Sequence, residues 1–122
     1  MYLHKFGGVY ADLDFESIRP MDEYLNGKQL VLGRMSTAPM LWSEHSIPNA
    51  FMASAPKHPF WIKVLEYISI NHEKNWVAEQ LTGPAMLYKL YNRNSHDKSI
   101  TISDYGIFNF LIFRHFIPLF LD

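Results

Sequence analysis

The sequence predicts a single α/β domain, because short apolar strands alternate along it with amphipathic helices. Four strands are expected, at Val9–Asp12, Leu30–Leu32, Asn49–Ser54 and Ser99–Ile102. Two helices are expected between the third strand and the fourth. With 122 residues the chain is long enough for one domain with a core of its own and too short for two.

Both helices are expected to start at a proline, a residue favoured at the first helical position. The first would begin at Pro59 and bury the apolar residues that recur at helical spacing after it: Trp61, Val64, Leu65 and Ile68. The second would begin at the run Thr82-Gly83-Pro84 and continue through Met86, Leu87, Leu90 and Tyr91. Ahead of the first strand, Met1–Phe6 is typical of the last turns of a helix that Gly7 ends.

The composition narrows the function classes. Apolar residues make up 48% of the chain, which indicates a globular protein. The net charge is −1, and no block of basic residues suggests nucleic acid as a partner. The chain has no cysteine, so disulfides, thiolate metal sites and cysteine nucleophiles are excluded. No Walker-type loop suggests ATP binding, and no serine–histidine pairing suggests nucleophilic catalysis.

One short run carries most of the functional information. Asp12 and Asp14 are separated by one residue at the end of a predicted strand, a spacing that points two carboxylates to the same side. Carboxylate oxygens suit hard cations such as Mg²⁺ and Mn²⁺, which bridge proteins to the phosphates of a substrate. Gly7 and Gly8 precede the strand and let the backbone bend sharply and approach a ligand closely.

The acidic pair alone has rival interpretations, of which two solvated loop carboxylates is the plainest. A calcium loop of the EF-hand type would begin at Asp12, but Ser17 stands where its turn needs glycine. An aspartyl phosphatase of the haloacid dehalogenase type would use Asp12 as its nucleophile, but Glu16 stands where that pattern has a small or β-branched residue. The surrounding sequence therefore has to decide.

The longer stretch LHKFGGVYADLD at positions 3–14, followed by RPMD at positions 19–22, resembles the sugar-binding D-x-D region of glycosyltransferase family 32. That family includes α-1,6-mannosyltransferases of the yeast Golgi and inositol-phosphoceramide mannosyltransferases. Three later runs fit the same family in order and spacing: NAFMAS at 49–54, HPF at 58–60 and LTGP at 81–84. The resemblance covers residues 1–104, the middle of the family's catalytic domain, whereas the apolar segment 105–122 matches nothing in it.

The resemblance implies a partial GT-A fold, the nucleotide-diphospho-sugar transferase fold, with a mixed sheet flanked by helices. It implies that Asp14 holds a Mn²⁺ or Mg²⁺ ion and that Asp12 contacts the donor or the metal. The other donor-binding residues that we expect are Gly8, Tyr10, Asn49, Thr82 and Gly83. Each of the last four has an ordinary alternative: packing against the sheet for Tyr10, turn capping for Asn49 and helix capping for Thr82 and Gly83.

The function implied is retaining transfer of a hexose, most readily mannose, from a nucleotide sugar to a glycan or glycolipid hydroxyl. The donor would be GDP-mannose or a UDP-sugar, and nucleic acid is not expected as a partner. A different class stays open: a truncated or inactive relative that binds sugar nucleotide or a partner without turnover. By resemblance the full-length protein would be membrane-associated in the Golgi lumen, with any anchor outside this chain, since no targeting signal is visible in it.

Overall fold

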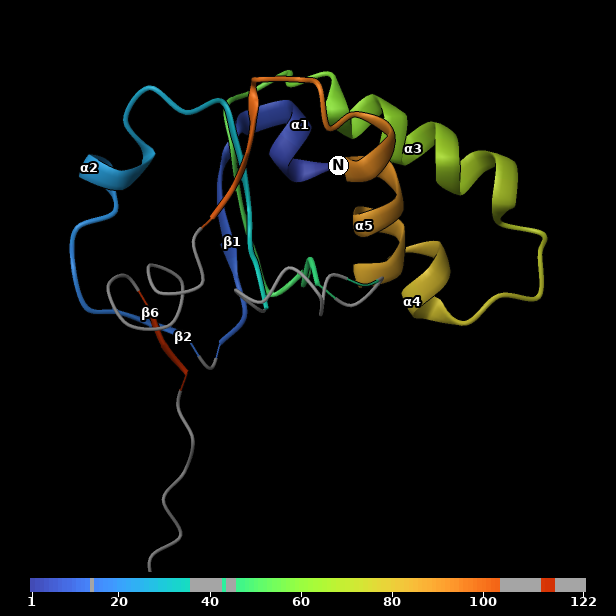
Figure 1. Ribbon diagram of the computed structural model, residues 1–122, viewed down its shortest axis with the longest axis horizontal. Helices are drawn as coiled ribbons and strands as arrows, with labels where there is room; N and C mark the ends of the chain where they lie inside the picture. The colour runs from blue at the N-terminus through green and yellow to red at the C-terminus, as the bar shows by residue number, and fades with distance from the viewer. Residues whose placement is uncertain (14, 36–42, 44–45, 104–112, 116–122) are drawn as a thin grey trace, which may run out of the picture.

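The computed structural model of the chain describes residues 1–13, 15–35, 43, 46–103 and 113–115 (Figure 1). Its main sheet has four strands in the order β1-β4-β3-β5: β1 (Gly8–Ala11), β3 (Leu30–Leu32), β4 (Phe51–Ser54) and β5 (Ile100–Ile102). Strand β4 is antiparallel to β1 and β3, whereas β3 and β5 are parallel. The sheet is therefore mixed, and the expected α/β class is confirmed.

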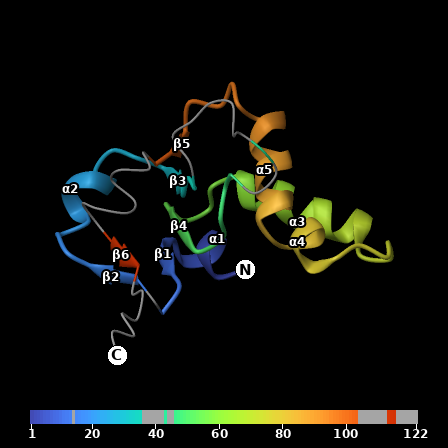
Figure 2. The same ribbon diagram turned by 60° about the horizontal axis from the view of Figure 1, so that its bottom comes forward.

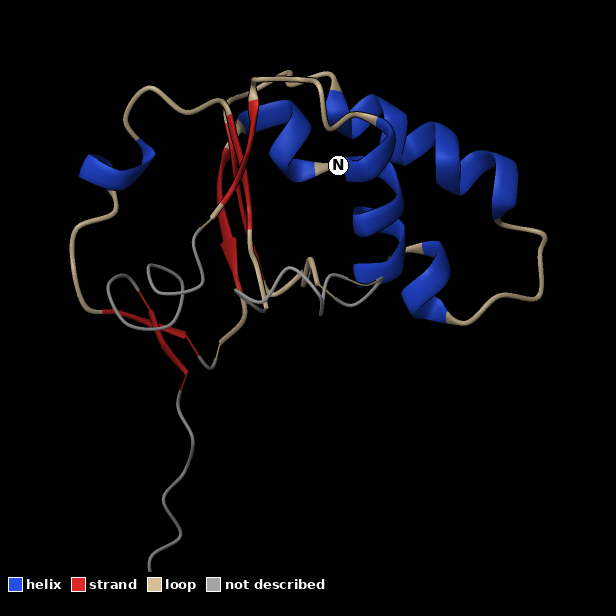
Figure 3. Ribbon diagram, viewed as in Figure 1, coloured by secondary structure: helices blue, strands red, loops and turns tan. Residues whose placement is uncertain are grey.

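Helices cover the two faces of this sheet unequally. On one side lie α1 (Tyr2–Phe6), α3 (Phe60–Asn71), α4 (Ala78–Leu81) and α5 (Pro84–Arg93), as Figure 3 shows in blue to the right of the strands. On the other side lies the single-turn helix α2 (Asp22–Leu25). A separate two-stranded ladder of β2 (Phe15–Ser17) and β6 (Phe113–His115) lies on the α2 side, beside β1 (Figure 2).

The larger core lies between the sheet and α3 and α5. Leu30, Leu32 and Ile100 point to this side, because alternate residues of a strand share a face. Helices α3 and α5 contribute most of the other buried apolar side chains: Phe60, Trp61, Val64, Tyr67, Met86, Leu87 and Leu90. Ile47, which precedes β4, completes this core. The indole Nε1–H of Trp61 donates a hydrogen bond of 2.9 Å to Ser54 Oγ, so the largest core side chain is tied to the sheet.

A smaller core covers the opposite face. Val31, Phe51 and Ala53 alternate with the residues of the first core and are buried there. The partly buried residues packed against them include Ala11 and Phe15 together with Met21, Tyr24 and Leu25 around α2. The central strands β3 and β4 therefore bury residues on both faces, which explains the continuous apolar run of β3, whereas the edge strand β1 is mostly exposed.

The helix end predicted at Gly7 is confirmed. Its N–H donates to Leu3 O at 2.9 Å, and its backbone has φ 67°, a conformation that favours glycine. A Cβ atom at this position would lie 2.7 Å from the carbonyl oxygen of Ser54. Gly7 therefore lets the chain leave α1 and enter β1 directly against strand β4.

The predicted strands and helices agree with the structure except at particular residues. Strand β4 begins at Phe51, because Asn49 and Ala50 form a turn. Pro59 is the N-cap of α3 and not its first residue. Leu65 was expected on the buried face, which is wrong: it is 43% exposed, and Tyr67 is buried in its stead. The start of α5 at Pro84 is confirmed.

The sequence analysis did not predict β2, α2, α4 or β6. The predicted boundary between residues 1–104 and 105–122 lies outside the described residues. Of the residues after 103, only the backbone of β6 at 113–115 is described. Within the described residues, no helix is both long enough and apolar enough to cross a membrane.

Candidate functional site

The carboxyl ends of three strands meet at one edge of the main sheet. Strands β1, β3 and β5 run in the same direction, and the amino end of the antiparallel β4 lies between β1 and β3 at that edge. In α/β sheets ligands bind outside the carboxyl ends of the strands. We call this the carboxyl edge; Asp12 follows β1 there, Asn49 precedes β4, and Ser103 follows β5.

Asp12 is fixed at the carboxyl edge by its backbone. Its N–H donates to Ala50 O at 2.9 Å, which extends the pairing of β1 and β4 by one residue. Its carbonyl oxygen accepts a hydrogen bond of 3.1 Å from Phe15 N–H at the start of β2. The N–H and the carbonyl oxygen of Asp12 are therefore both held by hydrogen bonds, and the exposed Asp12 carboxylate faces solvent. The second aspartate of the pair, Asp14, lies outside the described residues.

Tyr10 is the residue whose side chain contacts the Asp12 carboxylate. Its hydroxyl donates a hydrogen bond of 2.8 Å to Asp12 Oδ1. This hydrogen bond and the negative charge of Asp12 raise the pKa of the Tyr10 phenol above its ordinary value. Tyr10 is 46% exposed because β1 is an edge strand, so the phenol packs only in part against the sheet. The Tyr10 hydroxyl therefore bonds to one carboxylate oxygen of Asp12, Oδ1, and not to the other, Oδ2.

Asn49 lies beside this pair. It is exposed, it stands in the turn before β4, and its neighbour Ala50 is the residue that accepts the Asp12 N–H. The structure therefore brings three of the predicted residues, Tyr10, Asp12 and Asn49, to the same place. An amide, a carboxylate and a phenol at one edge of the sheet offer donors and acceptors suited to sugar hydroxyls.

Thr82 and Gly83 lie at the start of α5, which Figure 1 shows at the same end of the molecule as the carboxyl edge. Each already has a structural role. The Thr82 hydroxyl donates to Ala78 O at 3.2 Å, and a Cβ atom on Gly83 would lie 2.8 Å from Glu79 Cα. Gly83 is therefore required by the close approach of α4 and α5. Contact of Thr82 or Gly83 with a donor stays a prediction.

Gly8 is not brought to the carboxyl edge. It is the first residue of β1, paired with Ser54 at the other end of the strand, four residues before Asp12. At the rise of a β-strand, four residues span about 13 Å. The structure gives Gly8 a backbone role, since its φ of 100° continues the turn out of α1. Its predicted contact with the donor stays a prediction.

Ser103 is a residue at this edge that sequence reasoning missed. Its N–H donates to Leu32 O at 2.8 Å, which continues the pairing of β3 and β5. Its side chain is 2% exposed, and its hydroxyl finds no hydrogen-bond partner in the described part of the chain. A polar residue directly after the apolar strand at Ile100–Ile102 was the available signal.

The metal prediction depends on residues that are only partly described. Over the described residues, no group of three or more histidine, cysteine, aspartate or glutamate side chains could hold a metal ion. A Mg²⁺ or Mn²⁺ ion that bridges protein to diphosphate needs only one or two carboxylates, because phosphates and water supply its other oxygens. The exposed Asp12 carboxylate, with Asp14 two residues later in the sequence, fits that donor set.

Comparison with known proteins gives three related sequences. The mannosyl phosphorylinositol ceramide synthases CSH1 and SUR1 of Saccharomyces cerevisiae are each 30% identical, over 102 and 108 residues, or 77% and 82% of this chain. The inositol phosphoceramide mannosyltransferase 1 of Schizosaccharomyces pombe is 38% identical over 71 residues, or 57% of this chain. The chain is a distant homologue of the fungal inositol phosphoceramide mannosyltransferases.

One relative is a mannosyltransferase by name, and the other two are named as synthases of mannosyl phosphorylinositol ceramide, which confirms the expected family relationship and the hexosyltransferase class at the level of the homologues. The matched regions make up 25% of CSH1, 26% of SUR1 and 20% of the Schizosaccharomyces pombe protein, so this chain spans about a quarter of their length. No family model matches the chain. No solved structure matches it either.

Proposed function

We propose that this chain carries the donor- and metal-binding edge of a retaining mannosyltransferase. The observation that supports this most is the position of Asp12, held by backbone hydrogen bonds at the carboxyl edge with Tyr10 against it and Asn49 beside it. The homology to three mannosyltransferases supplies the reaction class. A GT-A arrangement of the whole catalytic domain, membership of glycosyltransferase family 32 and a Golgi location belong to the same proposal.

The residues of this chain would act mainly by binding and orienting the donor. Asp12 and Asp14 would hold a Mn²⁺ or Mg²⁺ ion, which supplies positive charge to the diphosphate as it leaves. Tyr10 keeps Asp12 Oδ1 occupied, which directs Oδ2 outwards to the ligand. Asn49 would hydrogen-bond to the hydroxyls of the hexose. Within the described residues no serine or cysteine nucleophile paired with a base lies at the edge, which agrees with attack by the acceptor hydroxyl on the face that the diphosphate leaves.

The donor and the acceptor follow from the homologues. We propose mannose as the transferred hexose, with GDP-mannose as its donor and a UDP-sugar as the alternative. The names of the relatives point to an inositol phosphoceramide glycolipid as the acceptor, whose hydroxyl would attack the anomeric carbon.

Calorimetry on the 122-residue chain tests the proposal. We expect GDP-mannose to bind in the presence of Mn²⁺ and binding to weaken at least about tenfold when EDTA removes the metal. Asp14→Ala and Asp12→Ala should each abolish the metal-dependent part. Glu23→Ala in α2 is the matched control, because it removes an exposed carboxylate away from the carboxyl edge and outside the runs that resemble the family. Metal-dependent binding that survives Asp14→Ala would sink the proposal.

A sugar-nucleotide-binding protein without turnover is the second candidate, because the chain aligns with only about a quarter of each relative. A turnover assay separates the two candidates. The same material is incubated with GDP-mannose, Mn²⁺ and inositol phosphoceramide, and mannosylated lipid is measured. Donor binding without product favours the second candidate, whereas product that depends on Asp14 establishes the first.

A further inference from the structure

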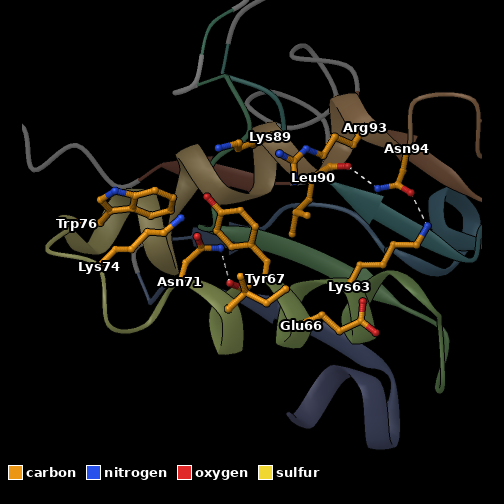
Figure 4. Close-up of a pocket in the computed structure, with 11 residues that line it drawn as sticks. Lys63, Glu66, Tyr67, Asn71, Lys74, Trp76, Lys89, Leu90, Arg93 and Asn94 are labelled. Carbon is orange, nitrogen blue, oxygen red and sulfur yellow. Dashed lines mark hydrogen bonds between the residues drawn. The ribbon is translucent and has the colours of Figure 1, made fainter.

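A hollow of about 490 Å³ lies between helices α3 and α5, and the charged residues that line it are mainly cationic. Figure 4 shows its side chains converging from both helices and from the segment that follows α3. We call it the α3–α5 hollow. Four of its lining side chains carry positive charge, Lys63, Lys74, Lys89 and Arg93, and one carries negative charge, Glu66.

This hollow is separate from the carboxyl edge. Asp12, Tyr10 and Asn49 do not line it. Its α5 residues begin at Lys89, six positions after Gly83, which corresponds to about 9 Å along a helix. A ligand in the hollow would therefore lie against the outer part of the helix layer and not at the proposed donor site.

The two lysines at one end of the hollow are held by aromatic rings. Lys74 Nζ lies 4.6 Å from the centre of the Trp76 ring. Lys89 Nζ lies 5.5 Å from the Trp76 ring and 5.7 Å from that of Tyr67. Cation–π attraction fixes the position of an ammonium group without neutralising its charge. Both ammonium groups therefore stay available to an anion.

The other end of the hollow is ordered by an asparagine. Asn94 is buried; its Nδ2 donates to Leu90 O at 2.7 Å, and its Oδ1 accepts a hydrogen bond from Lys63 Nζ. A buried amide with both ends bonded holds this lysine against α5. Arg93 is exposed on the same turn of α5. Positive groups are thus placed at both ends of one hollow.

None of the four cationic side chains forms an ion pair with a carboxylate within the described residues. The whole chain, by contrast, has a net charge of −1. Gathering like charges around one hollow is unfavourable unless a counter-ion reduces the repulsion. The arrangement therefore indicates an anion as the partner of this surface.

We propose that the α3–α5 hollow binds a phosphate group, either of a free phosphate ester or of a phospholipid headgroup. A phosphate carries up to two negative charges and presents oxygens in several directions, so it can engage cations that approach from two helices at once. A carboxylate carries one charge in one plane and matches a single guanidinium better. The proposal is independent of the function assigned to the carboxyl edge.

Amide NMR titrations of the 122-residue chain test this proposal. The probes are inorganic phosphate, myo-inositol 1-phosphate, and vesicles of phosphatidylcholine with or without phosphatidylinositol. We expect saturable shifts at Lys89, Arg93 and the Trp76 indole, weakened by added salt. Shifts with a soluble phosphate assign the hollow to a free ester. Shifts only with vesicles that contain phosphatidylinositol assign it to a headgroup.

Charge-removing variants make the test specific. The double variant Lys89→Gln with Arg93→Gln should weaken binding at least about tenfold, since each removes a charged hydrogen-bond donor. Glutamine is a good helix former, so α5 should be retained; Lys74→Gln, outside any helix, is a second variant should α5 be disturbed. Lys98→Gln is the matched control at an exposed site away from the hollow.

Two results would overturn the proposal. One is the absence of saturable binding by every probe. The other is equal binding by the double variant and the Lys98→Gln control. Neither result affects the Mn²⁺-dependent binding of GDP-mannose, so failure here and failure of the proposed function are distinguished.

Discussion

The Tyr10 hydroxyl donates a hydrogen bond to Asp12 Oδ1 over an oxygen–oxygen distance of 2.8 Å. Tyr10 belongs to the edge strand β1, and Asp12 follows that strand two positions later, where its N–H continues the pairing with β4, so the two side chains lie on the same side of the sheet. A carboxylate with one oxygen bonded in this way has a restricted orientation, and its other oxygen takes no part in this hydrogen bond. Tyr10 is therefore a positioning residue for Asp12 in the proposed donor site.

Tyr10→Phe should weaken Mn²⁺-dependent binding of GDP-mannose several-fold while leaving the fold intact. The substitution removes one hydrogen bond to a charged group at a half-exposed site, which is a smaller loss than removing the Asp12 carboxylate itself. Calorimetry of Tyr10→Phe and Asp12→Ala measures the two effects. The reverse ranking, with Tyr10→Phe the more damaging change, would contradict a positioning role.

A spectroscopic signature separates positioning from simple packing. The Asp12 charge and hydrogen bond raise the pKa of the Tyr10 phenol. In Asp12→Asn the pKa should fall back towards the ordinary value, because the acceptor is no longer charged. NMR of labelled tyrosine ring carbons over a pH titration measures this, with Tyr10→Phe to assign the resonance. An unchanged pKa would mean that the hydrogen bond is absent in solution.

Gly7→Ala should destabilise the chain more than Gly8→Ala. Both glycines have positive φ, 67° and 100°, so any side chain at either position costs about 1 kcal/mol or more. A Cβ atom on Gly7 would also lie 2.7 Å from Ser54 O, whereas one on Gly8 would have nothing within 4 Å. The difference between the free energies of unfolding, measured in urea, isolates the steric contribution. Equal losses would mean that α1 and β4 can separate without cost.

The elements that the sequence predicted are those whose residues are apolar and bounded by glycine or proline. Leu30–Leu32 is the clearest case, a buried run ended by Gly33, and its strand has the predicted bounds. The end of α1 at Gly7 and the start of α5 at Pro84 were equally marked by residues with restricted or unusual backbone freedom. At these three places the local sequence was sufficient to predict where the element begins or ends.

The parts that were missed depend on tertiary contacts. Strand β2 has three residues and exists by pairing with β6, almost a hundred residues later in the chain, so no local pattern marks it. Leu65 falls at helical spacing after Pro59, yet the face of α3 turned towards the sheet and α5 buries Tyr67. Helical periodicity finds an apolar face but does not determine which of two apolar residues near its border is buried.

The candidate site shows the same division. Asp12 and Tyr10 could be predicted together because they are two residues apart in the sequence, whereas Asn49 joins them through the antiparallel pairing of β1 and β4. Ser103 reaches the carboxyl edge only through the parallel pairing of β5 with β3. The donor-binding roles of Tyr10, Asp12 and Asn49 stay predictions, and the binding experiments above address Tyr10 and Asp12.

Gly83→Ala should destabilise the packing of α4 against α5. The added Cβ atom would lie 2.8 Å from Glu79 Cα and 3.2 Å from Glu79 O, which are backbone atoms and cannot rotate away. We expect a loss of about 1–3 kcal/mol in the free energy of unfolding, typical of overpacking. Thr82→Ala is the neighbouring control: it removes one exposed hydroxyl contact to Ala78 O and should cost less. A Gly83→Ala protein as stable as Thr82→Ala would contradict the close approach.

His58 gives the fold a pH dependence in the mildly acidic range. The ring is buried; Nδ1 accepts a hydrogen bond of 3.2 Å from Phe60 N–H, so the neutral ring carries its proton on Nε2, 2.9 Å from Ser99 Oγ. Burial lowers the pKa of His58 below its ordinary value of 6.5, against the opposing attraction of Asp97. Protonation would place a second N–H against the Phe60 N–H at the start of α3.

The direction of this dependence follows from the lowered pKa of His58. Above about pH 6.5 the imidazole is neutral in both the folded and the unfolded chain, and stability is full. As the pH falls below 6.5 the unfolded chain takes up the proton first, so stability is lost down to the folded-state pKa. Asp97 contributes in a separate window: hydrogen bonds from Ser99 lower its pKa, so its contribution is lost only as the pH falls below the ordinary value of 3.8.

Urea unfolding at a series of pH values between 7 and 5 measures the His58 contribution. His58→Asn should be less stable than the wild-type chain at pH 7, because it loses the contact with Ser99, but its stability should change less towards pH 5. His96→Asn is the control, an exposed histidine whose loss should leave the slope unchanged. If His58→Asn kept the wild-type dependence of the free energy of unfolding on pH, the proton taken up on acid unfolding would belong to another group. The neutral state that we assign to the buried His58 imidazole would then be wrong.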